Sequence, residues 1–330
     1  MKQPRGRLRL ALCIIALSGA AAACGPASSA GPTTTRPTQE AASTTAAPST
    51  PAFPVAIGAA NGTVRIGSRP TAIISLSPTA TEMLYAIGAG DQMKAVDEYS
   101  DYPPEAPRTK LSGLDPNIEA IVGYHPDLVV VAGDTTGLTG RLRSFGIPVL
   151  SLPAANTLLD VYRQIAELGE ATGHRIQAAS LAARMRSEIA SIVRSTPRAA
   201  APITYYYELD PTYYSVTSTT FVGSLLSLLG MRSIADTAEG ANSGYPQISA
   251  EYIIRADPDF VILADTVCCA QNARTIAARP GWSVIRAVKA GHIVGLNDDI
   301  ASRWGPRIVI LLREVAAAVR RAERTASVPS

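Results

Sequence analysis

The sequence predicts an α/β fold of two lobes joined by a long helical stretch. Three patterns in the 330-residue chain predict it. Short apolar runs alternate with amphipathic segments from about residue 64 onward, which is typical of lobes built on mostly parallel strands. A long helical stretch at about residues 158–194 then interrupts the alternation. A second set of strand patterns follows it, and this set repeats part of the first.

The first lobe opens with a buried-strand pattern and a clear helix start. The apolar run at residues 72–76 precedes Ser77 and Pro78, which are a capping residue and a proline suited to the first helical turn. Gly88 is expected to end this helix. Two further apolar runs predict strands of the same lobe at residues 128–131 and 147–150.

The helical stretch and the second lobe follow. A break near Gly173 divides the stretch, and apolar residues recur at helical spacing in its second half, at Leu181, Met185, Ile189 and Ile192. The second lobe is predicted from three strand patterns and two helix patterns, at residues 203–208, 260–263, 293–296, 221–229 and 308–322.

The two lobes also share an internal repeat. Glu119 stands seven residues before a Pro-Asp pair and a buried strand, and Glu251 stands seven residues before a second Pro-Asp pair and strand. A Ser-Gly pair precedes each copy, at residues 112–113 and 243–244. The repeat indicates two similar lobes, and a cleft between two α/β lobes is a common place for a ligand.

The amino-terminal residues read as an export signal. Four basic residues, an apolar run at residues 10–17 and a string of small residues lead to Cys24, in the pattern of a secretory signal. A cysteine in this place resembles the bacterial lipobox, although Ala21 stands where leucine is usual; an ordinary signal peptide cleaved near Cys24 is the alternative. We therefore expect a signal peptide (1–23), a lipidated Cys24 with a disordered Ala/Ser/Thr/Pro tether (24–62), an N-terminal lobe (63–157), a helical connector (158–197), a C-terminal lobe (198–325) and a tail (326–330).

Composition excludes several classes of function. The formal charge of +3 includes four basic residues of the signal, so 26 basic and 27 acidic residues remain after cleavage, a net charge of −1. A near-neutral chain gives no electrostatic reason to bind nucleic acid. The three histidines are not spaced as metal ligands, and the chain has no nucleophile elbow, so we expect no enzyme activity, no cofactor and no metal site.

Several segments together resemble the iron-siderophore and vitamin B12 class of ABC-transporter binding proteins. The matching stretches lie, in the family's order, at residues 73–82, 99–104, 126–129, 169–173 and 302–307. The resemblance covers about residues 64–322 and implies the helical-backbone metal-receptor fold, in which two Rossmann-like lobes are joined by a long rigid α-helix. It also implies a monomeric, lipid-anchored receptor on the outer face of the cytoplasmic membrane. Such a receptor captures an iron siderophore, haem or cobalamin and delivers it to an ABC permease.

The resemblance also implies roles for individual residues. Glu119 and Glu251 match the two acidic residues that dock onto arginines of the permease; the alternative is that each only complements a helix N-terminus. Tyr99 matches an aromatic pocket residue of cobalamin binders. We expect the ligand site to contain aromatic and polar residues from loops after predicted strands, at Ser77, Tyr99, Asp134, Thr135, Tyr213, Tyr214, Asp265, Arg303 and Trp304. Arg303 would meet an anionic chelate as a fork donor, or else be a surface arginine.

Two adjacent cysteines remain in the C-terminal lobe. Cys268 and Cys269 are the last cysteines left after Cys13 leaves with the signal and Cys24 takes lipid. An oxidising compartment favours a vicinal disulfide beside the cleft, and two free thiols are the alternative. A cell-envelope interaction protein that keeps the binding-protein fold is the alternative function, and a hydrolase with a cryptic site is a third.

Overall fold

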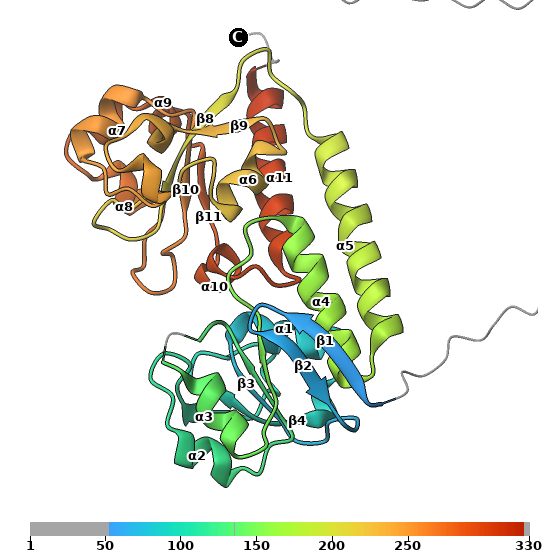
Figure 1. The fold of residues 1–330 in the computed structure, drawn as a ribbon. Helices are drawn as coiled ribbons and strands as arrows, with labels where there is room; N and C mark the ends of the chain where they lie inside the picture. The colour runs from blue at the N-terminus through green and yellow to red at the C-terminus, as the bar shows by residue number, and fades with distance from the viewer. Residues whose placement is uncertain (1–52, 135, 327–330) are drawn as a thin grey trace, which may run out of the picture. The chain divides into compact units, whose positions relative to one another are not determined.

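The computed structural model describes residues 53–134 and 136–326, which belong to one compact unit, Ala47–Ser330 (Figure 1). The expected signal peptide, Cys24, most of the tether and Thr135 lie outside the described residues. Within the described part of the chain, no helix is long and apolar enough to span a membrane.

The lobe begins earlier than the sequence analysis placed it. Strands β1 (Val55–Ala59) and β2 (Gly62–Ile66) form an antiparallel hairpin, so a tether reaching residue 62 is wrong. Valine and isoleucine alternate with exposed residues in both strands and bury one face of the hairpin against the main core. The amide of Asn61 in the turn bonds the edge strand of the first sheet, donating to the Val149 carbonyl at 2.8 Å.

The N-terminal lobe is a five-stranded parallel sheet. Its strands are β3 (Ile73–Leu76), β4 (Met93–Asp97), β5 (Arg108–Leu111), β6 (Leu128–Val131) and β7 (Val149–Ser151), in the order β5-β4-β3-β6-β7. Its helices are α1 (Pro78–Ala86), η1 (Gly90–Gln92), α2 (Ile118–Gly123) and α3 (Leu138–Ser144). The chain reverses its direction of travel across the sheet between β3 and β6. Open α/β sheets usually bind ligands outside the carboxyl ends of the strands at such a point.

The C-terminal lobe repeats this plan with four parallel strands. They are β8 (Ile203–Glu208), β9 (Met231–Ser233), β10 (Phe260–Leu263) and β11 (Ile293–Gly295), in the order β11-β10-β8-β9. Its helices are α6 (Phe221–Ser227), η2 (Ile234–Thr237), η3 (Ala241–Ser243), α7 (Ala250–Ala256), α8 (Ala273–Ala277), η4 (Trp282–Val284), α9 (Arg286–Ala290), α10 (Asp298–Ser302) and α11 (Ile308–Ala326). The predicted two-lobe α/β fold is therefore confirmed.

Two helices, rather than one, form the connection between the sheets. Helices α4 (Leu158–Thr172) and α5 (Arg175–Ser195) pack against each other as a hairpin, and α5 also packs against α11 (Figure 1). Gly173 has φ +80° and ends α4 where the sequence predicts the break. Gly169 lets the two helices approach closely, because a Cβ at this position would overlap the Cβ of Ala178.

The internal repeat has a structural reason. In the first lobe, Asp127 accepts hydrogen bonds from the backbone of Thr71 and Ala72, which lead into β3. In the second lobe, Asp259 accepts from the backbone N–H of Thr204 on β8 at 2.8 Å. Each aspartate therefore fixes the start of its own strand beside the start of its neighbour. Both copies also place a left-handed residue before the proline, His125 and Asp257.

Candidate ligand-binding site

The loops that follow the strands form the candidate site. We call them the carboxyl-end loops: residues 98–107, 112–117, 132–137 and 152–157 in the first lobe, and residues 209–220, 234–249, 264–272 and 296–307 in the second. Because all strands of each sheet are parallel, the loops of one lobe emerge at one edge of its sheet. Every described residue that was predicted from the sequence to contact the ligand, apart from Ser77, lies in these loops.

An ion-pair network joins the loops of the two lobes. The Arg303 guanidinium lies 3.1 Å from the Glu82 carboxylate on α1 and 2.9 Å from that of Asp101. It also pairs with Asp299 on its own lobe at 2.6 Å and donates to the Tyr99 carbonyl at 3.0 Å. Since the side chain of Glu82 is only 1% exposed, this contact is shielded from solvent.

Arg307 shares the same carboxylate. Its Nε donates to Glu82 at 2.9 Å, and its guanidinium lies 4.1 Å from the centre of the Tyr102 ring. Arg303 and Arg307 are therefore both ion-paired with acidic groups of the protein itself. The prediction that Arg303 offers a free fork donor to an anionic chelate is wrong for this structure, because its donors already bind acidic groups and a carbonyl.

Aromatic side chains are exposed in loops of both lobes. Tyr99 is 55% exposed and Tyr214 is 42% exposed, as a ligand-contacting role requires. Tyr213 is half-buried and stacks on Trp282, with 6.1 Å between ring centres. Trp304 is half-buried against the main core, and its indole N–H donates to Gln164 at 3.0 Å, so one edge of this ring is already engaged.

Two exposed apolar residues at matching positions of the repeat were not predicted as ligand contacts from the sequence. Tyr245 is 52% exposed and follows the Ser-Gly pair of the second repeat; Leu114 is 80% exposed and follows the Ser-Gly pair of the first. The repeat itself was the signal that could have found them. Tyr102, also exposed, lies in the same loop as Tyr99.

Three polar residues predicted to contact the ligand differ in how far the structure exposes them. Ser77 is buried and caps α1, accepting a hydrogen bond from the Ala80 N–H at 3.3 Å. Asp265 is 0% exposed. Neither side chain has surface for a ligand, so these two predictions are wrong for this conformation. Asp134 remains exposed; burial opposes its ionisation, but hydrogen bonds from Thr139 outweigh this and lower its pKa.

Asp265 instead belongs to a buried charge cluster below the loops of the second lobe. Arg279 binds both carboxylate oxygens of Glu208, at 2.5 and 2.7 Å, and donates to the Gln271 side chain at 2.9 Å. Neither oxygen of the Asp265 carboxyl accepts a hydrogen bond from the described residues. Burial, and then the nearby Glu208 carboxylate, raise the pKa of Asp265 to about 7. The guanidinium of Arg279 also covers the Trp282 ring at 4.7 Å.

The loop that leaves Asp265 carries the adjacent cysteines. The structure joins Cys268 and Cys269 in a disulfide. The backbone N–H groups of Val267 and Cys268 donate to the Asp298 carboxylate, at 2.9 and 2.7 Å. This loop and the edge strand β11 line a cavity of about 660 Å³. The disulfide therefore lies at the rim of the second lobe, tied to the start of α10.

Glu119 and Glu251 occupy equivalent exposed positions. Each is the second residue of a short helix, α2 or α7, whose N-cap side chain is Asn117 or Ser249. Hydrogen bonds from its own backbone N–H and from Ser249 lower the pKa of Glu251. Both carboxylates thus face solvent while complementing a helix start, so the geometry is compatible with both alternatives of the sequence analysis.

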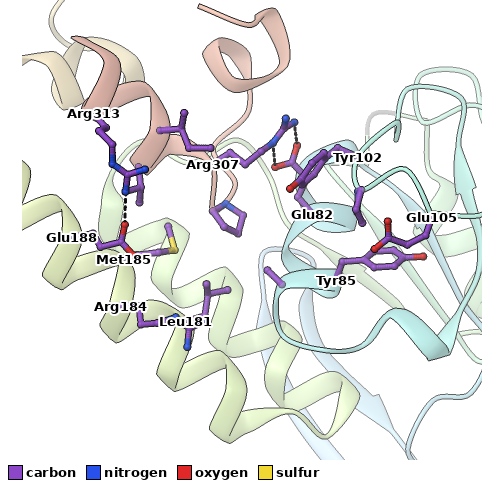
Figure 2. Close-up of a pocket in the computed structure, with 15 residues that line it drawn as sticks. Glu82, Tyr85, Tyr102, Glu105, Leu181, Arg184, Met185, Glu188, Arg307 and Arg313 are labelled. Atoms are coloured by element: carbon purple, nitrogen blue, oxygen red, sulfur yellow. Dashed lines mark hydrogen bonds and ion pairs between the residues drawn. The ribbon is translucent and has the colours of Figure 1, made fainter. Parts of the chain in front are cut away.

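A separate cavity lies on the helical side of the molecule. It has a volume of about 370 Å³, and α1, α5 and α11 contribute its walls (Figure 2). Figure 2 shows the Glu82–Arg307 pair at one end and the Glu188–Arg313 pair at the other, above Leu181 and Met185 of α5. Tyr102 and Glu105 of the loop after β4, with Pro306 and Arg307 of the loop after β11, complete its walls, so this cavity borders the carboxyl-end loops of both lobes.

The carboxyl-end loops are strongly acidic. All of them except residues 152–157 contain at least one carboxylate, and their acidic residues are Glu98, Asp101, Glu105, Asp115, Asp134, Asp210, Asp236, Glu239, Asp265, Asp298 and Asp299. Their basic residues are Arg303 and Arg307, which are both paired. Among residues 53–134 and 136–326 no group of three potential ligands is placed to hold a metal ion. The site therefore presents tyrosines and negative charge.

Comparison with known proteins identifies the fold. The family model described as "periplasmic binding protein" matches residues 73–300. A cobalamin-binding protein of Halobacterium salinarum is 32% identical over 278 residues, covering 81% of this chain and 74% of that protein. An uncharacterized ABC transporter substrate-binding lipoprotein of Bacillus subtilis is 30% identical over 280 residues, covering 82% and 87%.

A solved structure agrees with these relatives. The periplasmic vitamin B12-binding protein of Vibrio cholerae superposes with a TM-score of 0.62 at 26% identity, covering 77% of this chain and 98% of that chain. The family model spans both sheets and the helices between them, so the match is to the whole two-lobe arrangement rather than to one α/β lobe. The chain belongs to the periplasmic binding protein family.

Proposed function

We propose that this protein is the extracytoplasmic substrate-binding component of an ABC importer and that its ligand is a corrinoid of the cobalamin class. The observation that carries the choice of ligand is the charge of the carboxyl-end loops, in which acidic residues predominate and both arginines are paired. The names of the relatives from Halobacterium salinarum and Vibrio cholerae support the same choice.

Charge discriminates between the ligands that the sequence analysis left open. Ferric catecholates and haem carry carboxylate or phenolate charge, and sites for such anions normally supply arginine or lysine. Here an anion would have to displace Glu82 or Asp101 from Arg303. A corrin ring carries its amide side chains without net negative charge, and its flat faces suit the exposed Tyr99 and Tyr214.

The test is binding by the purified mature domain to a panel of chelates. Cyanocobalamin, haem and a ferric catecholate are compared by fluorescence quenching and by thermal shift. A ligand present at a hundred times its dissociation constant adds about 2.7 kcal/mol to the free energy of unfolding. We expect a shift with cyanocobalamin alone. A shift with haem or the catecholate and none with the corrinoid would contradict the proposal, and no shift with any chelate would favour an envelope interaction protein.

The remaining roles follow from this assignment. We propose that Glu119 and Glu251 dock the monomeric receptor on its permease, because they are exposed at equivalent positions of the two lobes. We also propose that lipid on Cys24 retains the protein at the outer face of the cytoplasmic membrane. The receptor role needs no catalysis and no resident cofactor.

A further inference from the structure

We infer that the carboxyl-end loops select the charge of the corrinoid and bind cationic forms more tightly than uncharged ones. The cationic forms lack the phosphodiester of the nucleotide loop or carry water in place of an anion on cobalt. The inference rests on the proposed corrinoid function. It adds to the proposed binding of a corrin ring a preference for corrinoids of positive charge.

The first support is the distribution of charge along the strand direction. The carboxyl-end loops carry the acids named above, whereas the last turns of the helices that return to the opposite edge carry bases. These bases are Arg141 and Arg143 in α3, Arg255 in α7 and Lys289 in α9. Although the mature chain is near neutral, 11 of its 27 acidic residues lie in the carboxyl-end loops, against two basic residues there.

The second support is the state of the two arginines in these loops. Arg303 and Arg307 face the carboxylates of Glu82, Asp101 and Asp299, so two positive charges meet three acidic groups. Burial, with the nearby Asp101 carboxylate, raises the pKa of Asp299, as expected where acids outnumber bases. The network therefore leaves no net positive charge for an anionic ligand.

The third support is that some of the acids are free. The side chains of Glu98 and Asp115 are exposed and have no hydrogen-bond or ion-pair partner among the described residues. They lie in loops that follow the adjacent strands β4 and β5, on the same lobe as the exposed Tyr99. A cation bound against Tyr99 would approach these carboxylates without displacing any existing partner.

The size of the effect follows from Coulomb's law. The two free carboxylates, if each lies about 10 Å from a single positive charge in water, favour its binding by roughly fourfold at very low salt. Screening with a Debye length of about 10 Å reduces the preference to roughly twofold at about 0.1 M salt. Loops with low-dielectric walls focus the field and increase both figures.

The experiment compares two ligand pairs that differ in charge. Cyanocobalamin and aquacobalamin share the nucleotide loop but differ by one positive charge at cobalt. Methylcobalamin and methylcobinamide share the methyl group on cobalt but differ by the whole nucleotide loop, whose phosphodiester carries one negative charge. Affinities are measured by calorimetry at low and at moderate salt, and visible spectra report any exchange of the cobalt ligand.

Two variants separate charge from shape. Glu98→Gln with Asp115→Asn removes two free carboxylates of the site, and Asp91→Asn is the matched control, since Asp91 is exposed in η1 at the opposite end of β4. We expect the cationic member of both pairs to bind at least threefold more tightly at low salt. The preference should shrink with salt and in the double variant, and stay unchanged in the control.

The outcomes are distinct. Equal affinities within both pairs, tighter binding of the uncharged members, or a preference that neither salt nor the double variant reduces would each overturn the inference while leaving the corrinoid function in place. Failure of every corrinoid to bind would overturn the proposed function as well.

Discussion

The buried carboxyl of Asp265 makes the free energy of unfolding depend on pH, and Asp265→Asn is expected to remove much of that dependence. In the folded protein, burial and the neighbouring Glu208 raise the pKa of Asp265 from 3.8 to about 7. An unfolded chain loses this proton near pH 4. Between about pH 4 and about pH 7 the folded state therefore binds the extra proton, and stability falls as the pH rises through this window.

The pKa shift of Asp265 sets an upper limit to this change in the free energy of unfolding. One pKa unit corresponds to about 1.4 kcal/mol, so a shift of about three units gives at most about 4 kcal/mol. The nearby Arg279 favours the ionised form of Asp265, and the pKa of about 7 already includes this attraction. We therefore expect the wild-type protein to lose up to about 4 kcal/mol between about pH 4 and about pH 8 through this group.

Urea unfolding at a series of pH values measures the effect. Asparagine mimics the protonated carboxyl in shape and can donate to Glu208, so Asp265→Asn should lose less stability than the wild type across the window. The exposed Asp91→Asn serves as the control and should follow the wild-type curve. Parallel profiles for wild type and Asp265→Asn would refute the reasoning, because the contributions of all other groups cancel in that comparison.

Three other predictions concern docking, the contact between lobes and the cysteines. Glu119→Ala combined with Glu251→Ala should abolish uptake in cells while leaving ligand affinity unchanged; normal transport, or lost binding, would contradict docking. Glu82→Gln removes the charge that two arginines share and should lower the free energy of unfolding by about 3 kcal/mol, measured by urea unfolding; an unchanged midpoint would show that the network adds little. Thiol titration of the unfolded, non-reduced domain should find no reactive thiol if Cys268 and Cys269 are bonded, whereas two reactive thiols would exclude the bond.

Local pattern was sufficient for most elements of the fold. The buried runs at β3, β6 and β10, the cap at Ser77 and the break at Gly173 all follow from residues adjacent in sequence. The hairpin β1–β2 was missed although its sequence held the signal. Asn61-Gly62 is a strong hairpin dipeptide between alternating apolar residues, but its alanines and glycines made the segment resemble the tether before it.

The candidate site was predictable only in part. The sequence placed its residues after strands, and the structure puts Tyr99 and Tyr214 at exposed positions there. The sequence could not show that Arg303 forms an ion pair with Glu82. These residues are 221 positions apart and meet only when the two lobes pack together. The same holds for Glu208 and Arg279, 71 positions apart, whose pairing leaves Asp265 buried beside them.

The sequence by itself determined the two α/β lobes, their helical connection and the internal repeat, because hydrophobic period, caps and helix stops act over a few residues. It also determined the acidity of the carboxyl-end loops, because parallel strands send these loops to one edge of a sheet. Only the tertiary structure decided which charges are free. A charged side chain is available to a ligand when folding leaves it unpaired, and its partner is set by packing between segments that are distant in sequence. For this reason Arg303 is half-buried and paired with acidic groups and Asp265 is fully buried beside Glu208, whereas Glu98 and Asp115 remain free.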